Sequence, residues 1–314
     1  MVSPRLLTAL YAAACHAQVP NPVDPAALTP LYEQVLQERE QLYGETSTQV
    51  AQAALDLGLQ LKVTGDLSGA ERMLRRALDI SNSPESAEGL AGVLEAQGHA
   101  EESLKLYRRA AEGPSDEVAA RSLARAAAIA ERSRNPQAAV QFYRAALARE
   151  EKASGPDNPK MAVRLIDLGV ATRDPELLRH ALRIQERAFG PVHPAISATL
   201  RDLSVTLLRA GKAAEAEPFA RRALAVLEKT RGLRHPLAAT AASNLADVLS
   251  ARGDSTAARH LYEQALAIDE AAYGPLHPKV ALDLKNLAGM LEKMGEKTAA
   301  RKLTARAAAI EQAQ

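Results

Sequence analysis

Residues 245–266, LADVLSARGDSTAARHLYEQAL, contain the pattern that decides the fold. An Asn-Leu pair begins nine residues before Gly253, and alanines follow five and twelve residues after it. The same columns surround Gly211 and Gly295, with Asp-Leu in place of Asn-Leu before Gly211, and each glycine lies 42 residues from the next. Self-similarity at a fixed period is the mark of a repeat architecture. The columns keep their register over three copies, so the sequence predicts a 42-residue structural repeat.

A second motif marks the joint between copies. It reads FGPVHP at 189–194, RGLRHP at 231–236 and YGPLHP at 273–278, with a poorer copy, SGPDNP, at 154–159. Glycine suits the left-handed residue that ends a helix, and proline suits the first turn of the next one. The residue before proline is held out of the helical region. We therefore expect each joint histidine to extend over the joint or to accept a hydrogen bond from the new helix.

The repeat frame extends toward the N-terminus. Gly65 and Gly98 occupy the turn position of earlier copies, and Arg134 takes the glycine place in the next one. The copy at 159–190 matches at both ends but is seven residues short. The segment 31–44 aligns with 261–274, which predicts that the array begins with a lone second helix. We count seven copies.

Composition and periodicity indicate an all-α protein. Ala, Leu, Arg and Glu dominate, aromatic residues make up 3% of the chain, and runs typical of strands are missing. In the last copy Leu284, Leu287 and Leu291 (or Met290) form one apolar stripe, and Gly295 ends that helix. Neither helix of a copy buries its stripe alone, so neighbours must stack. The predicted fold is an α-solenoid of about seven antiparallel helix pairs.

These features resemble the tetratricopeptide repeat, a helix–turn–helix unit with a turn glycine and small residues on its second helix. The 42-residue period and the G-x-x-H-P joints look similar to the kinesin-light-chain type. The resemblance covers about residues 27–314 and is strongest over 190–314. It implies a non-catalytic interaction scaffold that holds a protein or an extended peptide against its first helices.

The resemblance also places candidate groove residues on the first helices, just before the signature leucine and one turn further on. Asn offers both a donor and an acceptor, so it can pair with the backbone of an extended peptide. The alternative is that the Asp or Asn of this column bonds to the backbone of a neighbouring repeat. The candidates are Arg201, Asp202, Arg209, Ser243, Asn244, Asp247, Lys285, Asn286 and Lys293.

The joint histidines do not predict a metal site. Equivalent positions in stacked repeats should lie about 10 Å apart, whereas zinc needs its nitrogens within about 2 Å of one ion. No phosphate-binding glycine loop, HExxH motif or nucleophile elbow is present. Charge is balanced, with 39 basic and 38 acidic residues, which disfavours nucleic acid. The sequence therefore predicts no enzyme, no cofactor, no metal and no small-molecule substrate.

The first 17 residues differ from the rest. One Arg precedes an apolar run from Leu6 to Ala14, which is too short to span a bilayer and is typical of a cleaved export signal. Cys15 follows three alanines and resembles a bacterial lipoprotein cleavage box, so lipidation there is the one membrane link predicted. The alternative function is then an exported or lipid-anchored assembly factor of a bacterial envelope complex. Mass spectrometry of the native protein distinguishes loss of 1–17, a lipidated Cys15 and an intact N-terminus.

The predicted organisation has four parts, and we expect a periplasmic or extracellular location rather than a cytoplasmic one. The parts are a signal peptide at 1–17, a Pro-rich linker at 18–26, N-terminal repeat helices at 27–154 and C-terminal repeats at 155–314, which comprise the shortened copy at 159–190 and three regular copies from 191.

Overall fold

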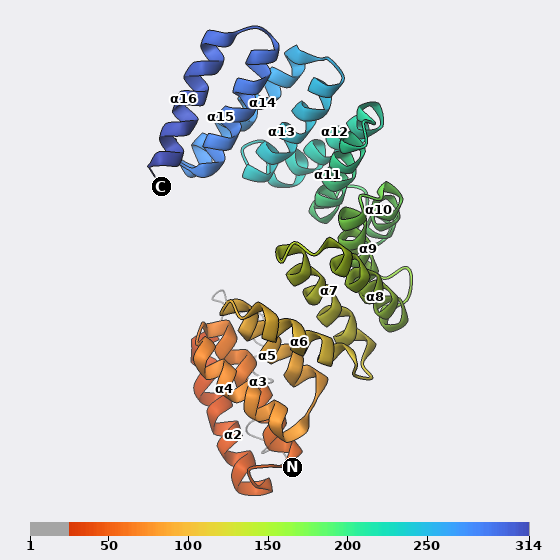
Figure 1. Ribbon diagram of the computed structural model, residues 1–314, viewed down its shortest axis with the longest axis vertical. Coiled ribbons are helices and arrows are strands. Elements are labelled where there is room, and N and C mark those ends of the chain that lie inside the picture. Colours follow the sequence, from red (N-terminus) through yellow and green to blue (C-terminus); the bar gives the residue numbers. More distant parts are fainter. Residues whose placement is uncertain (1–24, 314) are drawn as a thin grey trace. The chain divides into compact units, whose positions relative to one another are not determined.

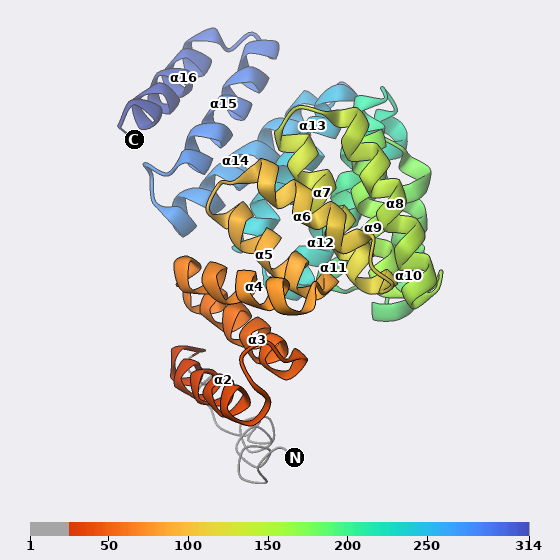
Figure 2. The same cartoon turned by 60° about the horizontal axis from the view of Figure 1, so that its bottom comes forward.

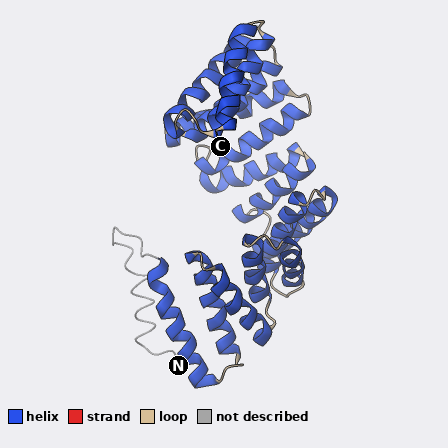
Figure 3. Cartoon of the chain, turned by 60° about the vertical axis from the view of Figure 1, so that its left-hand side comes forward, coloured by secondary structure: helices blue, strands red, loops and turns tan. Residues whose placement is uncertain are grey.

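The computed structural model of the protein describes residues 25–313. The predicted signal peptide and Cys15 lie outside the described residues, as does all but the end of the predicted linker. The described part of the chain is built from helices joined by short loops and contains no strand (Figure 3). No helix within it is both long enough and apolar enough to cross a membrane.

The helices follow one another, the α-helices with connections of two to four residues. They are the 3-10 helix η1 (Pro25–Leu28) and the α-helices α2 (Thr29–Tyr43), α3 (Thr48–Thr64), α4 (Leu67–Ser81), α5 (Pro84–Ala96), α6 (Ala100–Ala111), α7 (Asp116–Arg132), α8 (Pro136–Ser154), α9 (Pro159–Thr172), α10 (Pro175–Phe189), α11 (Pro194–Arg209), α12 (Ala213–Arg231), α13 (Pro236–Ala251), α14 (Ser255–Tyr273), α15 (Pro278–Lys293) and α16 (Lys297–Gln312).

Seven antiparallel pairs result, from α3–α4 to α15–α16, and within each unit a helix packs most closely on its neighbours in sequence. Helix α2 has no partner of its own and packs on α3, so the array begins with a lone second helix as predicted (Figure 2). The predicted class, an all-α solenoid of about seven helix pairs, is confirmed.

The chain divides between Pro114 and Ser115 into two compact units, whose helices are labelled in Figure 1. The first contains α2 to α6 and the second contains α7 to α16. The division expected at 154/155 falls at the loop between α8 and α9, inside the second unit.

Small residues allow the paired helices to approach closely. The alanine columns of the repeat are fully buried, as Ala258 and Ala265 show at 0% exposure. Leu245 and Leu287, the leucines of the signature, are also buried between helices. A core made of alanine and leucine, with few aromatic rings, therefore runs through the second unit.

The turn and joint glycines adopt different backbone conformations. The turn residue Gly65 has φ 89° and ψ 0°, which is left-handed helical, and Arg173 occupies the same region at φ 56° and ψ 39°. The joint residue Gly274 has φ 84° but ψ 161°, a region that is essentially restricted to glycine. The expectation of a left-handed joint residue was wrong, because the chain must leave the helix extended to reach the next one.

The shortened copy keeps both helices. Compared with the next copy, it lacks two residues from its first helix (α9 against α11), four from its second (α10 against α12) and one from the connecting loop. The missing residues therefore come from helix ends, and the packing of the pair is retained.

Candidate functional site

Four of the nine predicted groove residues line one pocket in the second unit. The pocket has a volume of about 230 Å³ and lies between α13, α14 and α15. Its lining consists of Asp247, Ser250, Tyr262, Lys285, Asn286, Gly289, Met290 and Lys293. The repeat register explains this grouping, because equivalent faces of consecutive first helices point to the same side of the stack.

Internal contacts already hold several polar groups of this pocket. The Tyr262 hydroxyl donates to Asp247 Oδ1 at 2.5 Å, and Lys293 Nζ donates to Ser250 Oγ at 3.1 Å. Burial raises the pKa of Asp247, and burial also raises the pKa of Tyr262. Lys285 Nζ forms an ion pair with Glu311 at 2.5 Å. Both lysines are exposed and keep further donors, since an ammonium has three.

Gly289 opens the pocket. It occupies the position in α15 that Asp247 occupies in α13, 42 residues earlier. A Cβ placed on Gly289 would meet nothing within 4 Å. The backbone of α15 is therefore uncovered beside Asn286, and a ligand can approach it closely.

A second pocket lies one repeat earlier, where α11, α12 and α13 meet. It has a volume of about 290 Å³ and is lined mainly by small and apolar side chains, with two guanidinium groups from Arg201 and Arg231. Arg201 is also paired with Asp202 at 2.8 Å, so two more of the predicted residues are fixed here. Leu237, which is 44% exposed, forms part of the wall.

The three remaining predicted residues lie elsewhere. Asn244 is 7% exposed and its Oδ1 accepts from the Ser204 hydroxyl of the preceding repeat at 2.6 Å. Ser243 faces the next interface, beside Asp283. Arg209 is exposed and lines neither pocket. The Asn244 side chain therefore bonds to a neighbouring repeat, but to the Ser204 side chain and not to the backbone as the alternative expected.

The sequence prediction missed residues of two kinds. Tyr262 and Arg231 belong to second helices, and the resemblance pointed to first helices alone. Gly289 contributes by lacking a side chain. Comparing repeat positions would have found it, because Val205 and Asp247 stand at this position in the two preceding copies.

The joint histidines cap helices. Nδ1 of His193, His235 and His277 accepts the backbone N–H two residues ahead, at 3.1, 3.1 and 3.2 Å. At the poorer joint Asn158 does the same, at 2.9 Å. His277 also stacks on Tyr273, with ring centroids 4.5 Å apart. The described residues contain no group of three or more potential metal ligands.

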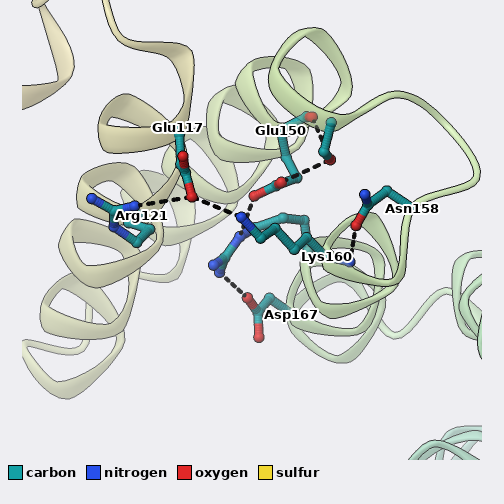
Figure 4. A network of polar contacts seen from close by, with 8 residues as sticks. Glu117, Arg121, Glu150, Asn158, Lys160 and Asp167 are labelled. Carbon is teal, nitrogen blue, oxygen red and sulfur yellow. Dashed lines mark hydrogen bonds and ion pairs between the residues drawn. The ribbon is translucent and has the colours of Figure 1, made fainter. Parts of the chain in front are cut away.

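A polar network joins the first helix pairs of the second unit (Figure 4). Lys160 of α9 pairs with Glu117 of α7 at 2.7 Å and lowers the pKa of that carboxyl. Arg164 of α9 lies 3.7 Å from the buried Glu150 of α8 and 2.9 Å from Asp167. Burial raises the pKa of Asp167, and Arg164 opposes that shift. The network connects α7, α8 and α9 by ion pairs.

Comparison with known proteins agrees with this architecture. The family model of the tetratricopeptide repeat matches residues 176–229 and 237–313. A crystal structure of a putative kinesin light chain from Podosopora anserina, with nearly identical TPR-like repeats, is 24% identical over 64% of this chain and 97% of its own, with a TM-score of 0.55.

Two further structures share the fold. Apo RapI is 14% identical over 83% of this chain and 97% of its own, with a TM-score of 0.61. The C-terminal part of a repeat-containing protein from Cytophaga hutchinsonii is 13% identical over 83% and 96%, with a TM-score of 0.53. A search of curated proteins found no significant match to the sequence.

The stacked helix pairs define an α-solenoid, a class of proteins in which extended surfaces serve protein interaction. Within that class, the family-model match identifies residues 176–229 and 237–313 as tetratricopeptide repeats. The predicted family is thereby confirmed.

Proposed function

We propose that the protein is an interaction scaffold whose second unit binds an extended peptide segment along α11, α13 and α15. The observation that carries this proposal is the pocket at α13–α15, where four residues predicted from repeat position gather. The tetratricopeptide fold supports protein interaction in general, and the pocket supports this particular face of the second unit.

The pocket favours a peptide that presents acceptors. Asn286 and the lysines at 285 and 293 offer donors, while the Asp247 carboxylate is engaged by Tyr262. A backbone carbonyl fits the Asn286 amide, and an acidic side chain or carboxylate fits the lysines. The open backbone at Gly289 allows a peptide main chain to lie close to α15.

Peptides selected from a random display library on the purified chain test this proposal. Asn286→Ala should weaken binding of a selected peptide about two- to tenfold, the worth of one neutral hydrogen bond, with little change in melting temperature. Asn244→Ala is the matched control. It should lower the melting temperature, because the buried Asn244 side chain and its hydrogen bond from Ser204 in the preceding repeat are lost, and it should leave affinity nearly unchanged.

Fluorescence polarisation gives the affinities and circular dichroism gives the melting temperatures. Selected peptides that bind the Asn286→Ala and Lys293→Ala variants as tightly as the parent chain would contradict the proposed site. A library that yields no binder would contradict the peptide-binding function itself.

A further inference from the structure

Two buried acidic groups meet between the last two repeats of the second unit. Asp269 of α14 is 4% exposed and Asp283 of α15 is 7% exposed. Each lies five residues from its joint: Asp269 before Gly274 and Asp283 after Pro278. Two like charges in contact within a low-dielectric interface repel strongly, so both groups cannot remain ionised at little cost.

The other joints of the second unit carry different residue pairs at the same two positions. Glu150 faces Arg164 at α8–α9, Thr199 donates to Gln185 at 2.7 Å at α10–α11, and Leu227 with Ala241 fills the position at α12–α13. Those pairs are oppositely charged, neutral or apolar. The acidic pair at α14–α15 needs a proton to reach an equivalent state.

The hydrogen bonds of the two side chains also indicate that the pair needs a proton. Asp269 Oδ1 and Asp283 Oδ2 are buried and lack a hydrogen-bond partner of good geometry within the described chain, and the Ser243 hydroxyl beside Asp283 lowers its pKa less than burial raises it. The two side chains are within hydrogen-bonding reach of each other. A carboxyl proton placed between them supplies the missing donor, with Asp283 as the acid and Asp269 as the acceptor.

The surrounding charges do not replace that proton. On α15, Lys279 and the His277 cap lie near the pair, but Lys279 is exposed and its Nζ contacts the Tyr273 hydroxyl at 3.1 Å. From α13 the neighbour is the neutral Ser243 hydroxyl. From α16, Arg306 is paired with Glu270 at 2.6 Å.

We propose that Asp269 and Asp283 share one proton, so that the last helix pair, α15–α16, docks on α14 most firmly below neutral pH and more weakly as the pH rises. Burial, together with the neighbouring Asp269 charge, raises the pKa of Asp283 to about 7. In the undocked or unfolded chain the same group titrates near its usual value of about 4.

The sign follows from proton linkage. Between about pH 4 and 7 the docked state keeps a proton that the undocked state loses, so each rise in pH favours undocking. One such proton changes the docking equilibrium by at most about tenfold per pH unit in that range. The effect is complete once the pair is ionised, and it does not depend on the proposed peptide-binding function.

Amide hydrogen exchange of the full-length chain tests the proposal. Protection factors in Lys297–Gln312, which remove the intrinsic pH dependence of exchange, should fall between pH 5 and 8 in the parent chain. Asp283→Asn keeps a donor for Asp269 but cannot ionise, so its protection should stay nearly constant and exceed that of the parent at pH 8. Asp254→Asn is the control, because an exposed helix cap of the same repeat changes from acid to amide. It should keep the parent's pH dependence.

A pH-dependent fall in Asp283→Asn equal to that of the parent would overturn the proposal, as would lower protection than the parent at both pH values. If Asp283→Asn does not fold, Asp269→Asn decides in the same way, since either amide removes the like-charge contact. Asp56, Asp167 and Asp247 also have raised pKa values. The test therefore compares the pH dependence of the protection factors between each variant and the parent chain.

Discussion

The joints α8–α9 and α14–α15 share one backbone plan and differ in the pair that fills it. Both end a helix with a glycine in the extended, glycine-only region, and both open the next helix with a side-chain cap followed by proline. At the first joint the buried position holds Glu150 and Arg164, and at the second it holds Asp269 and Asp283.

The comparison teaches that the joint fixes geometry and leaves chemistry open. An ion pair, a hydrogen bond, an apolar pair and an acidic pair occupy the same place in four consecutive joints of the second unit. The ion pair joins opposite charges without a shared proton, whereas the acidic pair depends on one. Equivalent repeats can therefore respond differently to the same change in conditions.

The largest expected effect comes from breaking the ion pair at α8–α9. Arg164→Met leaves Glu150 buried at 2% exposure without its cation, and loss of one partner of a buried pair costs about 3–5 kcal/mol of unfolding free energy. Urea denaturation measures this loss of unfolding free energy. Arg187→Met is the control, because that arginine and its partner Asp157 are both largely exposed, and it should cost less than about 1 kcal/mol.

The sequence offers its own rescue for that variant. Glu150→Leu with Arg164→Ala reproduces the apolar pair of α12–α13. It should recover part of the lost stability, because the buried Glu150 charge is removed while Asp167 still loses its Arg164 partner. If Arg164→Met and Arg187→Met cost the same, the buried pair has no special role and the comparison of the two joints fails.

A smaller effect tests whether the backbone conformations of the joints α8–α9 and α14–α15 are equivalent. Gly155→Ala and Gly274→Ala should each cost about 1–3 kcal/mol, because alanine is strained where φ is near 84° and ψ is near 160°. Gly253→Asn should cost less, since the turn position of other repeats already holds Arg134 or Arg173 at positive φ. Thermal melts with a known enthalpy give the three values.

Joint glycines that differ by more than about 1 kcal/mol would show that the two joints are not equivalent in the folded chain. A Gly253→Asn loss as large as that at the joints would show that both glycine classes meet the same restriction.

Much of the fold could be predicted because it depends on spacing. The turn glycines, the alanine columns and the lone second helix that begins the array follow from period and pattern. Arg134 could be placed at a left-handed turn by register alone. The glycine-only conformation at Gly274 could not, since a Gly-x-x-His-Pro string fits either conformation.

The candidate site was predictable only in part. Lys285 and Asn286 follow from repeat position, but Asn244 has the same position and is buried against Ser204. That difference depends on the Ser204 hydroxyl in the preceding repeat, and the Asn column alone does not show this contact. The Asp269–Asp283 contact joins two different columns and two repeats, so it also required the packed structure.

The smallest effect concerns the caps, where the two joints use Asn158 and His277 for one hydrogen bond. His277→Ala removes the acceptor for the Lys279 N–H and should cost about 1 kcal/mol, as cap removal commonly does. His277→Asn should cost less, because an amide oxygen serves that role at α8–α9. The ring stacking on Tyr273 is lost in both variants, so the difference between them isolates the cap. Equal losses for alanine and asparagine, measured by urea denaturation, would assign the histidine to stacking and leave the two caps chemically distinct.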